Sequence, residues 1–303
     1  MSLNQLINIR QIPIILILYF FSQVAISNEL NWQENNQKNT LPIKNNYNRN
    51  NDPPTTIKLI TIDSNTKLSI KLLNLWWDNR EDINNQKILI NYFLIKNDTS
   101  NLPQNYELLW KTARLIYFIG NYGEGKKIFI DSKNKDSAII IFNYGAEVGK
   151  LASKLQPNSV EGHYWYAINL GSYGLAKGIL ASAMYAKSGM NSLKTANVID
   201  SKYNWCGSSR ILGRYNQELP YIIGGSSSLA KGLLLDAVDK CPTFNNNWLF
   251  LGNYYNSLKD YTNALASCNV AKKLKSLDGK YEDVRYQAEI NECIALATQH
   301  LTK

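Results

Sequence analysis

The stretch that most constrains the fold is residues 245–274, NNNWLFLGNYYNSLKDYTNALASCNVAKKL. Its large and small residues recur at helical spacing: Trp248, Leu251, Gly252, Tyr255, Ala264 and Ala271. Glycine and alanine at such positions let two antiparallel helices approach closely, and the large side chains fill the space between neighbouring helix pairs. The stretch therefore predicts one helical hairpin of a repeat array.

The same spacing matches the tetratricopeptide repeat (TPR) consensus, and it continues backwards along the chain. Ala230, Ala237 and Pro242 fit the second helix of the preceding repeat. Further matches lie in residues 145–159, 161–174, 72–98 and 107–120. We expect an all-α, TPR-like α-solenoid over residues 57–303, with about five helical hairpins and a capping helix near 280–300. The outer face of that last helix is expected to be charged, as in a terminal cap.

The amino-terminal residues predict export. Residues 1–27 carry one charge, Arg10, then an apolar run at 12–21 and a small-x-small site ending at Ser27, which is the pattern of a signal peptide. The run is short for a membrane span of about 20 residues, and an uncleaved anchor is the alternative. No cysteine lies near the cleavage site, so the sequence does not indicate a lipid anchor, and we expect a periplasmic protein. Residues 28–56 are rich in asparagine and predict a flexible linker.

Charge and cysteine content add weaker constraints. Lysine and arginine exceed aspartate and glutamate by 33 − 24 = 9, which favours anionic partners, although an AT-rich genome would produce the same bias. The lysines are dispersed, so we expect no nucleic-acid partner. The four cysteines form no C-x-x-C motif. In an oxidising compartment we favour the disulfides Cys206–Cys241 and Cys268–Cys293, and the alternative is that Cys268 and Cys293 are buried thiols.

No motif points to catalysis. Residues 120–127, GNYGEGKK, match part of a phosphate-binding loop, but Lys127 replaces the Ser or Thr that coordinates magnesium, so we expect a glycine-rich turn. The chain has only two histidines, His163 and His300, and neither has a partner at a metalloprotease spacing. We therefore expect no enzyme activity, no cofactor and no metal.

Two stretches predict binding. One is HYWYAINLGSYG at 163–174, and the other is WCGSSRILGRYNQELPYIIGG at 205–225. The candidate ligand- or partner-binding residues are Tyr164, Tyr166, Tyr173, Arg210, Arg214 and Tyr215. Tyrosine has an apolar ring and a polar hydroxyl, so it suits a partly hydrated binding groove. Two arginines four residues apart can bind a carboxylate or an acidic segment of a partner. The alternatives are ordinary packing between hairpins for the tyrosines, and carbonyl-binding structural roles for the arginines.

Residues 208–255 resemble the T component of TRAP transporters. The match is a Leu-Gly-Arg helix, a Pro- and Gly-containing connection, and an Ala-rich helix ending in Pro: Leu212, Gly213, Arg214, Pro220, Gly224, Gly225, Ala230, Ala237 and Pro242. The resemblance covers roughly residues 70–275. It implies a periplasmic helical protein that forms trimers with a channel through each subunit. Such a protein would partner a solute-binding protein and bind a small hydrophobic or carboxylate ligand.

The resemblance supplies no catalytic residues. Family members are often lipoproteins, and this chain lacks the lipid-bearing cysteine. We expect an accessory protein of a TRAP-type solute transport system. The alternative is a structural protein-interaction scaffold of the cell envelope that holds no ligand. A tunnel lined by the candidate aromatics would favour the first, and a packed solenoid would favour the second.

Overall fold

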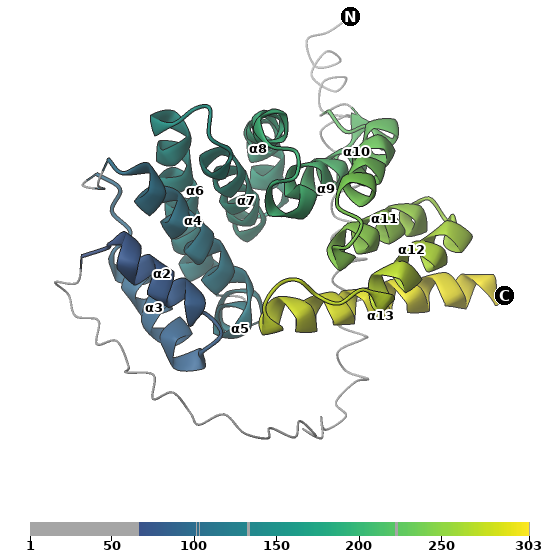
Figure 1. Cartoon of the computed structure of the whole chain (residues 1–303), viewed down its shortest axis with the longest axis horizontal. Coiled ribbons are helices and arrows are strands. Elements are labelled where there is room, and N and C mark those ends of the chain that lie inside the picture. Colours follow the sequence, from purple (N-terminus) through teal and green to yellow (C-terminus); the bar gives the residue numbers. More distant parts are fainter. Residues whose placement is uncertain (1–66, 101, 103, 132–133, 222–223, 303) are drawn as a thin grey trace, which may run out of the picture. The chain divides into compact units, whose positions relative to one another are not determined.

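A computed structural model describes residues 67–302, apart from 101, 103, 132–133 and 222–223. They belong to one compact unit, Leu59–Lys303. The predicted signal peptide, the linker and the lead-in at 56–62 lie outside the described residues. Every regular element in the described part of the chain is a helix (Figure 1).

Ten of these helices form five antiparallel hairpins. They are α2 (Ile70–Asp78) with α3 (Ile83–Ile95), α4 (Tyr106–Asn121) with α6 (Lys135–Leu155), α7 (Val160–Lys177) with α8 (Ile179–Ile199), α9 (Tyr203–Glu218) with α10 (Ser227–Lys240), and α11 (Asn245–Ser257) with α12 (Tyr261–Lys273). A last helix, α13 (Lys280–Leu301), packs on α11 and α12. The predicted hairpins and closing helix are confirmed.

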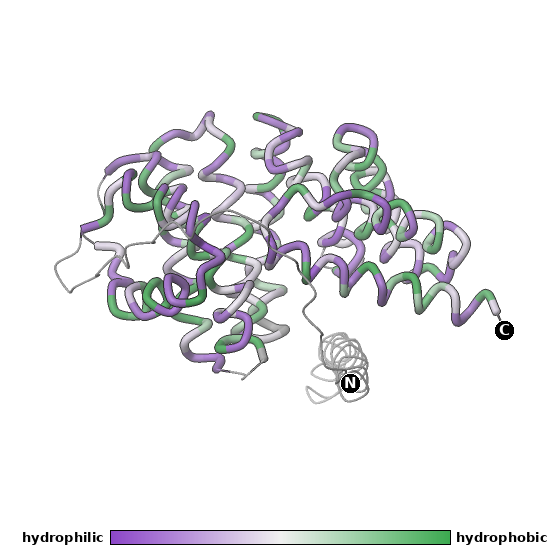
Figure 2. The backbone as a smooth tube through the Cα atoms, turned by 60° about the horizontal axis from the view of Figure 1, so that its bottom comes forward, coloured by the Kyte–Doolittle hydropathy of each residue, from purple (hydrophilic) through white to green (hydrophobic). Residues whose placement is uncertain are grey.

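Short polar side chains fix where several helices begin. The side-chain oxygens of Ser69, Asp82, Asn105, Asn134, Ser226 and Asp260 each accept a hydrogen bond from a backbone N–H in the first turn. Such caps satisfy donors that have no partner within the helix. Figure 2 shows hydrophobic and hydrophilic residues alternating along the helices, as expected when one side of each helix is buried.

Glycine sets the closest helix contact, between α6 and α7. A Cβ at Gly149 would lie 2.7 Å from the backbone nitrogen of Tyr166, and one at Gly162 would lie 2.6 Å from that of Ser153. Real Cβ atoms do not approach backbone this closely, so only glycine permits this packing. This is the role that the sequence analysis assigned to small residues in the hairpins.

Both favoured disulfides form. Cys206–Cys241 joins the first turn of α9 to the end of α10, and Cys268–Cys293 joins α12 to α13. The Gly-rich stretch at 120–127 was expected to be a turn, but the chain leaves helical conformation only at Tyr122. The stretch follows helix α4 rather than a strand, and it contains the three-residue helix α5 (Gly123–Gly125) and the start of a π-helix (Lys126–Asp131).

The prediction of a charged outer face on the last helix is wrong. The exposed positions of α13 are mostly uncharged, and they include Val284, Ala288, Ala295 and Leu296. The charged side chains at Arg285 and Glu289 are only 32% and 34% exposed and pair with each other. Arg285 also lies over the ring of Tyr122 at the end of α4. Its side chain is therefore oriented by a contact with the first half of the array and not towards solvent.

Candidate functional site

The first helix of each hairpin contacts the first helix of the next. This series runs through α2, α4, α7, α9, α11 and α13. We use the name first-helix face for the layer of arginine and aromatic side chains on these helices or at their ends: Trp77, Arg80, Trp110, Arg114, Tyr117, Phe118, Tyr122, Trp165, Tyr203, Arg210, Arg214, Phe244, Phe250 and Arg285. Five members of this layer are buried: Phe118, Tyr122, Trp165, Arg210 and Phe244.

In the part of the chain that the structure describes, every arginine belongs to this face. The chain has seven arginines, and the five among the described residues are Arg80, Arg114, Arg210, Arg214 and Arg285. None lies on the second helix of a hairpin, whereas lysines occur on both sets of helices. Every one of the five guanidinium groups lies over an aromatic ring, at 3.7–6.0 Å from the ring centroid. Arginine stacks in this way because its guanidinium is planar and weakly hydrated.

At one corner of the first-helix face, two arginines stack on the ring of Trp77. The guanidinium carbons of Arg114 and Arg80 lie 3.7 Å and 4.4 Å from its ring centroid. Arg114 also lies 5.0 Å from the Trp110 ring. Within the described residues, Arg114 has no hydrogen-bond or ion-pair partner, and its Nε is buried. Burial lowers the pKa of Arg114 from 12.5 to about 10. This guanidinium therefore stacks on two rings with no hydrogen bond or ion pair among the described residues, and it remains cationic at neutral pH.

Two of the predicted site residues belong to a buried network. Arg210 is 4% exposed, and its Nη1 donates to the carbonyl of Trp205 at 3.0 Å and to Oδ1 of Asn247 at 2.7 Å. Tyr164 is 3% exposed, and its hydroxyl accepts from Asn204 Nδ2 at 2.7 Å. Burial raises the pKa of Tyr164 to about 12. For Arg210 the geometry matches the alternative that the sequence left open, a structural arginine on a carbonyl.

This network holds an unusual turn at the start of α9. Asn204, Trp205 and Cys206 have φ angles of 49°, 51° and 60°, in the left-handed region. Each such residue costs roughly 1–2 kcal/mol when it is not glycine. The cost is offset by the bonds to Tyr164 and Arg210, by the disulfide, and by stacking of Trp205 on Phe244 at 5.0 Å. The turn places Tyr203 beside Trp165 on the first-helix face, where its hydroxyl accepts from Trp165 Nε1 at 2.9 Å.

The other four predicted residues lie in separate surroundings. Arg214 is 51% exposed and pairs with Glu218 at 2.6 Å, and its guanidinium shares the Phe250 ring with that of Arg210. Tyr215 extends from α9 to Gly171 of α7, where a Cβ would lie 2.8 Å from its hydroxyl. Two tyrosines lie away from this face: Tyr166 packs by α6, and Tyr173 contacts Tyr185 of α8. The arginine pair is thus brought together, and the tyrosine cluster is not.

Sequence reasoning missed Arg80, Arg114 and Arg285. They sit in three separate segments with no shared motif. One signal was available: arginine is scarce in this lysine-rich chain, and four of its seven arginines, at 80, 114, 210 and 214, lie in predicted first helices.

The first two turns of α13 contact the first two hairpins of the array. The backbone N–H of Lys280 donates to Oε1 of Glu81, and the hydroxyls of Tyr286 and Tyr122 lie 3.5 Å apart. Glu282 approaches Arg80, with 3.8 Å between Oε1 and Nε. These contacts bring the last helix to the same corner of the first-helix face as Trp77.

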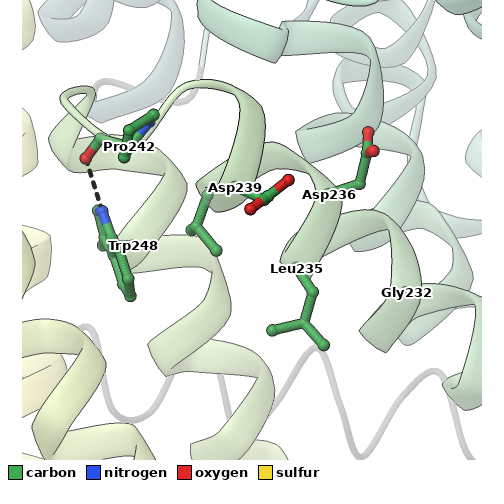
Figure 3. Close-up of a pocket in the computed structure, with 7 residues that line it drawn as sticks. Gly232, Leu235, Asp236, Asp239, Pro242 and Trp248 are labelled. Atoms are coloured by element: carbon green, nitrogen blue, oxygen red, sulfur yellow. Dashed lines mark hydrogen bonds between the residues drawn. The ribbon is translucent and has the colours of Figure 1, made fainter.

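A separate open pocket of about 630 Å³ lies on α10 and the start of α11 (Figure 3). It is lined by Gly232, Leu235, Asp236, Val238, Asp239, Pro242 and Trp248. Asp236 is already bound by Ser209 and Lys240, and Trp248 Nε1 donates to the carbonyl of Pro242 at 2.8 Å. None of the six predicted residues lines this pocket, so it is not the aromatic groove that the sequence predicted.

Two further observations concern the described residues only. They contain no group of three or more His, Cys, Asp or Glu side chains arranged to hold a metal ion. No helix among them combines the length and apolar character needed to cross a membrane.

Comparison with known proteins supports the repeat fold. A family model described as "Regulator of microtubule dynamics protein 1-3" matches residues 76–219. The crystal structure of TTC0263, a thermophilic TPR protein of Thermus thermophilus, aligns with a TM-score of 0.50 and 17% identity. That alignment covers 75% of this chain and 97% of that one. No curated protein matches. The predicted TPR-like α-solenoid is confirmed, and this is a fold that typically presents extended surfaces to protein partners.

Proposed function

We propose that this chain is a protein-interaction scaffold whose first-helix face binds a carboxylate-rich segment of a partner. The observation that carries the proposal is the confinement of all the arginines of the described residues to this face, each over an aromatic ring. An arginine can stack on a ring and still present its N–H edge to a carboxylate. Such charge-assisted bonds are about twice as strong as bonds between neutral groups.

Arg114 is the proposed anchor of the bound segment. Its guanidinium has no partner among the described residues, while Trp77 and Trp110 fix its plane. A carboxylate at this point would give hydrogen bonds to a group that now has none, and the fixed plane reduces the entropy lost on binding. Lys111, one turn earlier on α4, adds positive charge beside the anchor, although Glu107 partly neutralises it at 2.7 Å.

The narrower role in a TRAP-type transport system stays a prediction. An accessory protein of that kind would use the same face for an acidic segment of a solute-binding protein. The comparisons do not bear on this role, and the pocket described above is not lined by the residues expected for a ligand tunnel.

Binding of an acidic segment can be measured with fluorescein-labelled octa-aspartate and the full chain by fluorescence anisotropy. Arg114→Gln should weaken binding by about tenfold or more, because charge-assisted bonds contribute about 1.5–3 kcal/mol. Lys187→Gln is the matched control, since it removes one positive charge from an exposed position on the second helix α8. The control should change the affinity less than twofold, which long-range charge alone can account for.

Equal affinities for the Arg114→Gln and Lys187→Gln variants would contradict the proposal, because binding would then follow net charge and not the first-helix face. Circular dichroism of both variants must match the wild type, so that a loss of binding cannot come from unfolding.

Microtubules are a second partner to test. The name of the matching family model refers to the regulation of microtubule dynamics. The matched residues, 76–219, include four of the five arginines on the first-helix face. Co-sedimentation of the full chain with microtubules, before and after proteolytic removal of the acidic tubulin tails, would test this candidate. Binding that is lost with the tails and with Arg114→Gln would support it, and the absence of co-sedimentation would exclude it.

A further inference from the structure

Glu282 brings a buried carboxyl group onto the first-helix face. The residue is 6% exposed, and its Oε1 lies 3.8 Å from Nε of Arg80. Within the described residues, neither Arg80 Nε nor Glu282 Oε2 has a hydrogen-bond partner. A well-formed guanidinium–carboxylate pair shares two short N–H···O bonds. Glu282 and Arg80 share none. Both groups are therefore desolvated, and their mutual attraction offsets only part of that cost.

This poor pair forms at the corner where an acidic partner would bind. Arg80 and Arg114 stack on the same ring, Trp77. The carboxylate of Glu282 therefore opposes any incoming carboxylate and competes with it for Arg80. The competitor sits in the first turn of α13, which the contacts of Lys280 with Glu81 and of Tyr286 with Tyr122 hold against the first two hairpins.

We infer that Glu282 is a built-in competitor: in its ionised form it occupies Arg80 and weakens binding of an acidic segment, and in its protonated form it releases Arg80. This inference rests on the proposed function. It predicts that affinity for an acidic partner rises as the pH falls through neutrality.

The surroundings of Glu282 favour its neutral form. Burial raises its pKa from 4.5 to about 7, and the opposing effect of Arg80 is smaller. The charged groups that act on Glu282 are Arg80 and Glu81 of the α2–α3 turn and Asp278 before α13. The titratable groups nearest to it along α13 itself are Lys280, Asp283 and Tyr286. Both Asp278 and Glu81 add to the rise in the pKa of Glu282. Free aspartate side chains have a pKa of about 3.9, so an aspartate peptide stays ionised throughout this range.

The test is the pH dependence of octa-aspartate binding by the full chain between pH 6.0 and 8.5. If binding raises the pKa of Glu282 by one unit, the wild type should bind about sevenfold more tightly at pH 6.0 than at pH 8.5. Glu282→Gln should bind at both pH values as tightly as the wild type does at pH 6.0. Glu289→Gln is the matched control: it removes one negative charge from the same helix and should keep the pH dependence of the wild type.

The inference is overturned if Glu282→Gln retains the sevenfold change, and the proposed function then stands by itself. If octa-aspartate binds neither the wild type nor the variants, the proposed function fails and this inference fails with it. A second measurement needs no ligand. In a carboxyl ¹³C NMR titration, the Glu282 resonance, assigned by its loss in Glu282→Gln, should titrate near neutrality, and titration near 4.5 would refute the inference.

Discussion

Removing the charge of Glu282 should stabilise the fold at alkaline pH. Burial of the side chain raises the pKa of Glu282 to about 7 in the folded chain, whereas a solvent-exposed glutamate has a pKa of 4.5. One unit of pKa corresponds to about 1.36 kcal/mol, so ionising this group in the folded state costs about 3 kcal/mol. Glu282→Gln keeps the shape of the side chain and removes that cost.

The sign of the effect follows from the direction of the shift. A carboxyl group whose pKa is raised by folding favours the folded state when it is protonated. Its contribution to the free energy of unfolding is therefore largest below pH 4.5, declines as the pH rises towards 7, and stays low above that. Asp278, whose pKa burial also raises, is present in both proteins, so its own titration largely cancels in the comparison.

The assay is urea unfolding of the wild type and of Glu282→Gln at pH 4.5 and pH 8.0. At pH 8.0 the variant should be more stable by up to about 3 kcal/mol, and at pH 4.5 the two should be nearly equal. In Glu289→Gln the loss of a half-exposed ion pair should cost at most about 1 kcal/mol at pH 8.0. If Glu282→Gln were less stable than the wild type at pH 8.0, Glu282 would be a net stabilising partner of Arg80, and the reasoning would be refuted.

Two further predictions concern packing. Arg210→Ala leaves Oδ1 of Asn247 without its buried donor, whereas the carbonyl of Trp205 still accepts from Asn247 Nδ2. The substitution should lower the free energy of unfolding by about 2 kcal/mol in urea titrations, and a loss below 1 kcal/mol would contradict the network. Gly149→Ala inserts a methyl group against the backbone of α7 and should cost about 2 kcal/mol. Gly232→Ala is its control: a Cβ there meets open space, so helix propensity should stabilise it by up to about 1 kcal/mol. Equal melting temperatures for the two glycine variants would show that α6 and α7 are not in close contact.

Much of the architecture could be predicted from local spacing. The positions of Trp248, Gly252 and Ala264 reflect the 3.6-residue period of one helix and the contact of two consecutive helices. The spacing of the cysteines left their pairing open, and the favoured pairs formed because each joins neighbouring helices of the array, as Cys268 and Cys293 do. The one error on the last helix concerned orientation: its charged residues were identified, but the side they face depends on what the helix meets.

The candidate site was only half predictable. Arg210 and Arg214 share one helix face, so their i, i+4 spacing places both beside Phe250. The roles of Tyr166 and Tyr173 could not be assigned in this way, because a helix that packs on three neighbours buries aromatics on several sides.

The sequence by itself determined the period, the number of hairpins and the pairing of successive helices, since these depend on interactions between residues near one another in the chain. The stacking of hairpins alone decided that Arg80, Arg114 and Glu282 would meet around Trp77. The contact between Tyr122 and Tyr286, which are 164 residues apart, shows the same dependence. Such contacts follow from the accumulated angle between successive hairpins, and that angle is set by side-chain packing at every interface between them.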